Sequence, residues 1–485
     1  MHFNSFSFIY FLAIVLILYF LTMRWWKLQN LLLLAASYLF YSLGGGPWVL
    51  LLLVPTLMDY SIGRLLGSLA DRLERTARLR KLLLAVSILG NLTILGVFKY
   101  YNFFTENLQV AFNVLHLSLD APTLSLMVPL GISFWTLKSM SYTIDVYQNR
   151  QEPVRSLVDY ALFLAFFPTL LAGPLDRARK FLPQIAAPRR LTPEQLKIGL
   201  HLILAGYFKK LVIADNLAMR IVNPVFSNSP EYYGLDILLA GLAFTFQLYG
   251  DFAGYTDIAR GAALLLGFDT ALNFRWPYFS FNPTDFWQRW HVSFSEWLRD
   301  YVFFPARRTM LRWKNAPPIL GLVLPPLVTM SLSGLWHGAS WTFVLWGVYH
   351  ACLIILYRLF EKKPIHQDPW KSGQAYPWVV LRLALMFSLT MVGWIIFRSS
   401  SLSQAGYLLG NLSLAPSAHS LDFFYDLVFY TAPWCLAEVL TYARKDLLLF
   451  VRLPFAARLL LNGTLLAGIV LLNARLATEF IYVQF

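Results

Sequence analysis

Stretches of apolar residues long enough to cross a lipid bilayer recur along this chain and constrain its fold more than any other feature. The clearest lie at residues 5–21, 82–98, 235–248, 339–359, 379–397 and 459–472. A helix of roughly 20 apolar residues spans the hydrocarbon core, where the backbone must satisfy its own hydrogen bonds. The sequence therefore predicts an all-α polytopic membrane protein with about 10–13 embedded helices.

The composition agrees with a membrane protein, because 58% of the residues are hydrophobic and only 14% are charged. Soluble domains carry about 25% charged residues. The first apolar run lacks a charged leader and a small-residue cleavage site, so we interpret it as a first span. Cys352 and Cys435 lie in apolar surroundings, which favours neither a disulfide nor a cysteine metal site. We expect residues 1–485 to form a single integral-membrane domain.

The formal net charge is +14, and the basic residues gather in short connections at residues 64–81, 177–190, 307–314 and 362–363. This distribution is typical of cytoplasmic loops in membrane proteins rather than of a nucleic-acid-binding surface. Counting spans from the start of the chain then places the N-terminus on the outer face.

The apolar segment at residues 157–173 conflicts with that count, because a full crossing would carry the next basic cluster to the outer face. Pro168 and the pair Gly173 and Pro174 also oppose a straight helix. A re-entrant segment removes the conflict. Irregular backbone at membrane depth is tolerated where it is packed in protein or lines a watery cavity, so we expect re-entrant segments around a central funnel.

The usual motifs of soluble enzymes, such as the P-loop and the nucleophile elbow, are absent from the sequence. Ionisable residues at membrane depth are therefore the leading functional candidates. On residues alone, a transporter and a structural scaffold stay open as alternative classes. A transporter would be expected to show inverted repeats or paired broken helices, and the sequence shows neither.

His337 lies in an apolar segment between Gly334 and Gly338, where small residues let a ligand or a neighbouring backbone approach. The residues leave two interpretations open, an active-site group or a hydrogen-bonded histidine in helix packing. If residues 336–349 formed one regular helix, His350 would face a different side, because a helix turns by about 100° per residue. We therefore expect His350 not to be a partner of His337.

His291 follows a segment that is predicted to form a helix from Pro283, capped by Asn282. Aromatic side chains recur on one face of it at helical spacing: Phe286, Trp290, Phe294, Trp297 and Tyr301. Arg289 faces elsewhere and is expected to pair with Asp285. Such a helix is typical of the membrane interface, with His291 either bordering an anchor or belonging to a site.

At these residues the chain resembles the membrane-bound O-acyltransferase (MBOAT) superfamily, and within it the bacterial alginate O-acetyltransferase branch. The resemblance covers most of the chain. It includes Arg-Trp-His at residues 289–291 and Ser-Gly-Leu-Trp-His-Gly at residues 333–338. The other segments that carry it are residues 128–134, 141–147, 166–174, 247–257, 273–278 and 480–485.

The resemblance implies an MBOAT-like helical bundle with His337 and His291 as catalytic residues and no metal. His337 would be the general base that activates a hydroxyl, and His291 would orient the acyl carbonyl or the thioester. An acyl-histidine intermediate is a further option. The substrate-binding residues implied by the same segments are Trp287, Arg289, Trp290, Trp336, Asn273 and Tyr255.

The implied reaction moves an acyl group, expected to be acetyl, from a cytoplasmic thioester to hydroxyls of an exopolysaccharide such as alginate, or to a periplasmic partner. No cofactor would stay bound. The donor would be acetyl-CoA or the phosphopantetheine thioester of an acyl carrier protein, and the basic inner surface would attract either. The expected location is the bacterial inner membrane, with a periplasmic N-terminus. D-alanyl transfer to teichoic acid and a transporter of polysaccharide or lipid-linked sugar are the alternatives.

Overall fold

A computed structural model describes residues 3, 5–70, 73–117, 122–171, 173–313, 315, 317–360 and 375–474. Within these ranges the regular secondary structure is helical, joined by turns and irregular segments, with one isolated bridge between Gly234 and Leu412. Seven helices among the described residues are long and apolar enough to cross a membrane. The prediction of an all-α polytopic membrane protein is therefore confirmed. The basic pair at residues 362–363 and the terminal segment at 480–485 lie outside the described residues.

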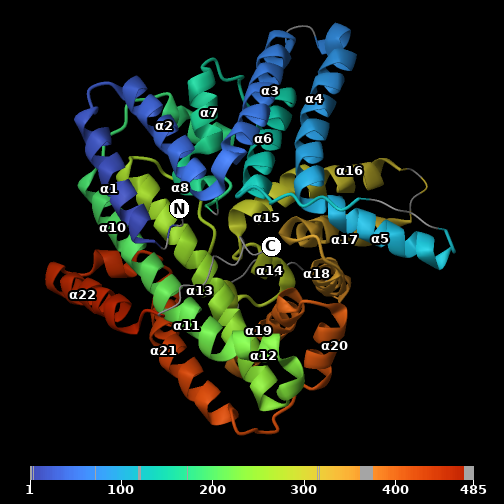
Figure 1. Cartoon of the computed structure of the whole chain (residues 1–485), viewed down its shortest axis with the longest axis vertical. Helices are drawn as coiled ribbons and strands as arrows, with labels where there is room; N and C mark the ends of the chain where they lie inside the picture. Colours follow the sequence, from blue (N-terminus) through green and yellow to red (C-terminus); the bar gives the residue numbers. More distant parts are fainter. Residues whose placement is uncertain are drawn as a thin grey trace. The chain divides into compact units, whose positions relative to one another are not determined.

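The chain packs as two compact units, unit 1 (Met1–Ile203 with Asp257–Ala271) and unit 2 (Leu204–Thr256 with Leu272–Phe485). In unit 1, α3 and α4 pack on α6, and α2 packs on α7 (Figure 1). Its helices are α1 (Phe6–Leu21), α2 (Trp26–Gly45), α3 (Val49–Ser68), α4 (Leu73–Leu95), α5 (Tyr101–Val114), α6 (Ile132–Tyr147), α7 (Leu157–Ala165), α8 (Phe167–Leu170), α9 (Ala178–Ile185) and most of α10 (Pro193–Tyr207).

The segment predicted to be re-entrant is broken into two short helices. The chain leaves the helical conformation at Phe166, between α7 and α8. At about 1.5 Å per residue, neither helix approaches the roughly 30 Å of a hydrocarbon core. Breaks of this kind also explain why there are fewer long spans than the 10–13 embedded helices predicted, since several apolar runs form short or interrupted helices.

Unit 2 carries both histidines that the sequence singles out. Its chain begins with the end of α10 and a π-helical stretch, η4 (Phe208–Ala214), and it includes α13 (Leu235–Leu265) as far as Thr256. The remaining named elements are α11 (Asp215–Leu217), η5 (Ala218–Val222), α12 (Asn223–Ser227), η7 (Pro277–Phe279), α14 (Pro283–Trp287), α15 (Val292–Leu298), η8 (Arg299–Phe303), α16 (Phe304–Arg312), α17 (Pro318–His337), α18 (Trp341–Phe360), α19 (Tyr376–Arg398), α20 (Leu402–Gly410), α21 (Ser420–Arg444) and α22 (Phe455–Leu472).

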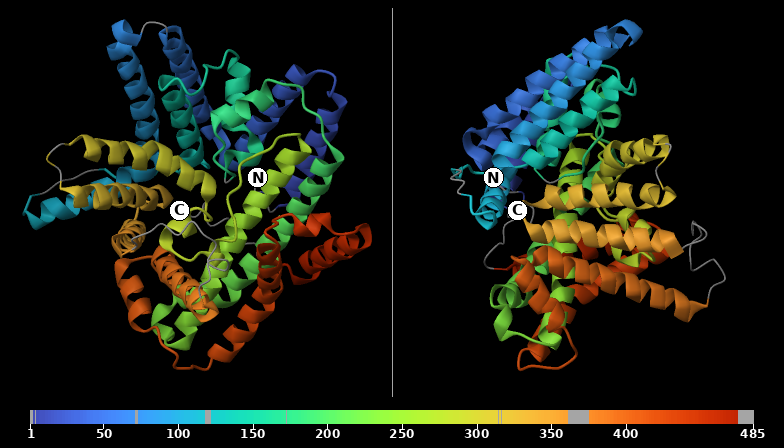
Figure 2. Two further views of the ribbon diagram at one scale, coloured as in Figure 1. Left: turned by 180° about the vertical axis from the view of Figure 1, so that it is seen from behind. Right: turned by 90° about the vertical axis from the view of Figure 1, so that its right-hand side faces the viewer.

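Helices α17 and α18 form a close antiparallel hairpin (Figure 2). Glycines allow this contact, because a Cβ at Gly334 would collide with the Phe343 carbonyl and a Cβ at Gly347 with the Met330 carbonyl. His337 is the last residue of α17, and the chain turns before Trp341. The premise that residues 336–349 form one helix is therefore wrong.

The prediction of one continuous aromatic helix starting at Pro283 is also wrong. Helix α14 ends at Trp287, and α15 begins only at Val292, after a turn in which His291 has a φ of +43°. The cap by Asn282 is confirmed, with its Oδ1 accepting from the Asp285 amide at 2.8 Å.

Long-range backbone hydrogen bonds cause the break after α14. The Arg275 amide donates to the Arg289 carbonyl, and the Val292 amide donates to the Asn273 carbonyl, both at 2.9 Å. These bonds replace helical bonds with pairing to the segment that precedes α14 in the chain. Four of the five aromatic side chains of the expected stripe are buried, which contradicts a membrane-interface anchor: Phe286, Trp290, Phe294 and Trp297.

A buried ion triad braces unit 2 near the site. Lys210 Nζ lies 2.8 Å from Asp215 Oδ1 and 2.6 Å from Asp251 Oδ1, and all three side chains are almost fully inaccessible. Removing one member of a buried ion network leaves charge without compensation. We expect Lys210→Met to lower the free energy of unfolding by about 3–5 kcal/mol.

Thermal unfolding in detergent measures this loss of stability. Lys197→Met is the matched control, because Lys197 forms a surface pair with Glu194, and such pairs contribute little. Equal unfolding temperatures for the two variants would contradict the bracing role of the triad.

Candidate active site

His337 lies at the end of α17 among aromatic rings. Its ring centroid is 4.9 Å from that of Trp336 and 5.1 Å from those of Trp346 and Phe397. The residue is only 4% exposed. Exclusion of water strengthens every electrostatic interaction inside such an enclosure, so a reaction at His337 would proceed in a low-dielectric environment.

Polar side chains of a tight turn hold His291. Its Nδ1 lies 3.3 Å from Oδ1 of Asn273, which also accepts a hydrogen bond from Ser293 Oγ at 2.6 Å. Asn273 Nδ2 lies 3.4 Å from Thr256 Oγ1 on α13, and the Phe252 ring lies 4.7 Å from the imidazole. A left-handed backbone at a non-glycine residue is strained and persists where its surroundings enforce it, often at functional sites.

This hydrogen-bond pattern indicates the tautomer of His291. An amide oxygen can only accept, so the contact with Asn273 Oδ1 requires the ring hydrogen on Nδ1. Burial lowers the pKa of His291 to about 3, which keeps the ring neutral near pH 7. Nε2 then carries a lone pair. His291 therefore offers an acceptor there, whereas orienting an acyl carbonyl would require a donor.

The fold brings the two predicted catalytic histidines into one aromatic cluster. The rings of Phe294 and Trp336 stack with their centroids 4.1 Å apart. His291 lies 5.0 Å from the first ring and 5.9 Å from the second, and His337 lies 6.1 Å from Phe294. The two histidines thus share the same pair of aromatic neighbours although they come from different elements.

His350 also joins this cluster, contrary to the expectation that it would face away. Its ring centroid lies 4.9 Å from that of Trp346, which is itself 5.1 Å from His337. Trp287 contacts both Trp346 at 5.8 Å and His350 at 5.2 Å. The physical reason is the break before Trp341, which resets the helical register on which the expectation depended.

Of the other three predicted substrate-binding residues, Trp290 is buried and belongs to the aromatic cluster. Its ring centroid lies 4.8 Å from that of Trp394, which lies 5.8 Å from that of Trp346. Arg289 pairs with Asp285 at 2.7 Å, which confirms the predicted pair, and its guanidinium lies over the Tyr442 ring at 6.0 Å. Tyr255 is buried on α13. Binding of substrate by these three residues stays a prediction.

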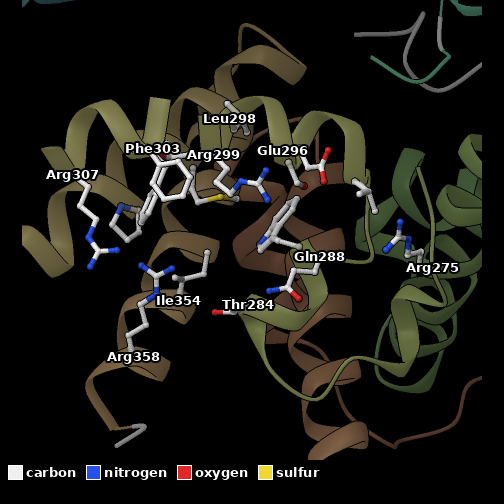
Figure 3. Close-up of a pocket in the computed structure, with 17 residues that line it drawn as sticks. Arg275, Thr284, Gln288, Glu296, Leu298, Arg299, Phe303, Arg307, Ile354 and Arg358 are labelled. Atoms are coloured by element: carbon white, nitrogen blue, oxygen red, sulfur yellow. The ribbon is translucent and has the colours of Figure 1, made fainter. Parts of the chain in front are cut away.

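A cavity of about 550 Å³ lies beside the aromatic cluster, and Trp287 belongs to its wall. Other lining residues come from α15, η8, α16, α17 and α18 (Figure 3). The basic lining residues are Arg275, Arg299, Arg307 and Arg358, and Glu296 is the acidic one. The guanidinium groups of Arg307 and Arg358 point toward one another at one end of the cavity (Figure 3). An anion between them would relieve their repulsion and accept hydrogen bonds from both.

The sequence did not indicate that Ser293 belongs to the site, where it donates to the same Asn273 oxygen that His291 contacts. It also predicted Arg307 only as part of a basic cytoplasmic loop, whereas Arg307 lines the cavity. A signal for the cavity does exist in the sequence. Ile354 and Arg358 follow His350 at steps of four along α18, and both line the cavity. Among the described residues, no group of three or more His, Cys, Asp or Glu side chains could hold a metal ion.

Comparison with known proteins gives a consistent family. The model of the MBOAT, membrane-bound O-acyltransferase family matches residues 2–396, a stretch that contains His291, His337 and His350. A probable alginate O-acetylase from Pseudomonas syringae pv. tomato is 38% identical over 84% of this chain and 74% of its own length.

Two other relatives are named for different activities. A peptidoglycan O-acetyltransferase from Helicobacter pylori is 30% identical over 83% of this chain and 78% of its own length. A teichoic acid D-alanyltransferase from Bacillus subtilis is 31% identical over 57% of this chain and 70% of its own length.

Proposed function

The chain belongs to the membrane-bound O-acyltransferase family and is a multi-pass O-acyltransferase, and from this premise we propose that it acetylates hydroxyl groups of a polysaccharide. The observation that carries the proposal is the single aromatic cluster holding His291 and His337 beside an arginine-lined cavity. Two of its relatives are named for O-acetylation of alginate and of peptidoglycan. A polysaccharide acceptor is common to both names, and an exopolysaccharide at the bacterial inner membrane is the acceptor that we propose.

In the proposed reaction, His337 accepts the proton of the attacking hydroxyl while the hydroxyl oxygen bonds to the carbonyl carbon of the thioester. The carbon–sulfur bond breaks, and His337 returns the proton to the departing thiolate. His291 offers its Nε2 lone pair to the hydrogen of a second, neighbouring hydroxyl of the acceptor and so orients the sugar, because its own hydrogen is engaged on Nδ1 by Asn273. Transfer to a periplasmic partner, in place of the polymer itself, would use the same chemistry.

The basic cavity suits binding of the thioester donor. Acetyl-CoA and an acyl carrier protein both present phosphate groups on a long arm that ends in a thioester. Phosphate would lie between Arg307 and Arg358, whose guanidinium groups point toward one another at one end of the cavity. The arm would then run past Trp287, which lines the cavity and contacts Trp346 beside His337.

Crowding around His337 supports a small acyl group. Trp336, Trp346 and Phe397 place their ring centroids within 5.1 Å of the imidazole, and Phe397 is braced by Phe343 at 4.8 Å. A two-carbon acetyl group needs less room there than a longer chain would. D-alanyl, which is bulkier and cationic, is the rival acyl group raised by the teichoic acid relatives.

Purified protein in vesicles tests this function. Acetyl-CoA and an acetylated acyl carrier protein are supplied separately with a polysaccharide acceptor, and free thiol and polymer-bound acetyl are measured together. We expect thiol release and acetylation in equal amounts with one of the two donors. A D-alanylated carrier consumed in preference to both acetyl donors would replace acetylation by D-alanyl transfer, and consumption of none would contradict the proposed donors.

The double variant Arg307→Gln and Arg358→Gln forms a second arm of this experiment. Loss of charged hydrogen bonds to phosphate should raise the KM for the phosphate-bearing donor roughly 10–100-fold, with kcat less affected. Arg220→Gln is the matched control, since Arg220 is half-exposed and pairs with Asp426. Equal KM values in the double variant and the control would exclude the cavity as the phosphate site.

A further inference from the structure

His350 is a buried polar side chain that lies among aromatic rings. The residue is 0% exposed, and neither Nδ1 nor Nε2 has a hydrogen-bond partner among the described residues. Rings enclose it: Phe286 lies parallel at 6.1 Å, and Trp287 and Trp346 present themselves edge-on at 5.2 and 4.9 Å. Leaving such a group unsatisfied costs about 1–3 kcal/mol, so its presence in an aromatic enclosure requires an explanation.

Two indole groups beside His350 share this property. The Nε1–H groups of Trp287 and Trp346 are buried and likewise have no hydrogen-bond partner among the described residues. The backbone of α19 comes close at Gly393, where a Cβ would stand only 2.9 Å from His350 Nε2. The two indole N–H groups are donors, and a neutral imidazole both donates and accepts a hydrogen bond. Together they suit a ligand that has carbonyl oxygens and an N–H group, such as an amide.

The position of His350 on α18 indicates which ligand it could bind. Along α18, Trp346 contacts His337, and Ile354 and Arg358 line the basic cavity. His350 lies between them, and its neighbour Trp287 also belongs to the cavity wall. From Trp346 to Arg358 the helix rises by roughly 18 Å at 1.5 Å per residue. A donor with its phosphate at Arg358 and its thioester at His337 would therefore run along the face of α18 that carries this residue.

We propose that His350 binds the amide groups of the pantetheine arm of the thioester donor, together with the indole N–H groups of Trp287 and Trp346. This assignment rests on the proposed thioester donor and adds a residue to the donor site. The orphaned nitrogens would then acquire partners only when the donor is bound. Free energy lost to unsatisfied groups in the empty enzyme would be recovered on binding, which favours the donor over water or an apolar molecule.

The experiment compares His350→Phe with His350→Gln. Phenylalanine keeps an aromatic ring in the enclosure without hydrogen-bonding atoms, and glutamine keeps a donor and an acceptor. The substrates are acetyl-CoA and S-acetyl-pantetheine, which has the amide arm but lacks the nucleotide. Cys352→Ala on the exposed side of α18 is the matched control.

We expect His350→Phe to raise the KM for both substrates roughly 3–10-fold, as loss of hydrogen bonds between neutral groups does. Its unfolding temperature should equal or exceed that of the wild type, because an apolar ring replaces unsatisfied polar atoms. His350→Gln should restore KM to within about twofold of the wild type. The arginine double variant, by contrast, should affect acetyl-CoA and spare S-acetyl-pantetheine.

An unchanged KM in a folded His350→Phe protein would overturn the assignment. So would a lower unfolding temperature in both the Phe and the Gln variants with KM unaltered, which would make His350 a structural residue. If the wild type releases thiol from no thioester, the proposed function fails together with this inference. Normal wild-type turnover combined with an insensitive His350→Phe variant rejects the role of His350 alone.

Discussion

His337→Ala is expected to abolish measurable acetylation of the polymer while the protein still accumulates in the membrane. Loss of a general base costs roughly 10²–10⁴-fold in rate. Folding should survive, because His337 ends α17 and the hairpin with α18 depends on close contact at Gly334 and Gly347. Polymer-bound acetyl and membrane protein level, measured in the same cells, check this expectation.

The control for that experiment must be a histidine outside the cluster. His350 does not qualify, since it contacts the same tryptophan as His337. His419, which is exposed at the start of α21, is the better choice. Near-normal acetylation by His337→Ala at normal protein level would refute the assigned base, and equal loss in His419→Ala would show that the assay reports general damage.

His291→Ala is expected to reduce turnover by roughly 10²–10³-fold, the range seen when a group that orients or stabilises the reacting atoms is removed. Asn273→Leu should come close to this loss without touching His291 itself. Leucine cannot accept the hydrogen bonds from His291 Nδ1 and Ser293 Oγ that fix the turn and the tautomer. Initial rates of thiol release at saturating donor measure both variants.

Asn273→Asp separates positioning of His291 from general packing. Aspartate keeps oxygens for both hydrogen bonds and has nearly the same volume, so it should retain more activity than leucine. A carboxylate next to the ring also favours the imidazolium form, so the activity of Asn273→Asp should decline at a higher pH than that of the wild type when the pH is lowered. Wild-type rates in Asn273→Leu would show that Asn273 does not position His291.

Local chemistry explains why much of the architecture was predictable. Apolar runs of about 20 residues have no stable alternative to helices in a bilayer, so the all-α polytopic class followed from the sequence. Asn282 and Pro283 start α14 as predicted, because a cap depends on neighbours within one turn. Pro168 likewise marks the segment that the structure breaks into α7 and α8. His291 and His337 were named as catalytic from a family resemblance, and their roles stay proposals.

Tertiary structure alone decided where the aromatic helix stops and what His350 touches. Helical periodicity continues through residues 283–301. The backbone hydrogen bonds from Val292 to Asn273 and from Arg275 to Arg289 divert the chain and hold His291 in a strained, buried position. The cavity draws its arginines from several separate elements, so no local pattern could assemble it. Periodicity describes only the interactions of a helix with itself. The long-range hydrogen bonds and close-packed glycines that stabilise unit 2 determine which residues meet at the site.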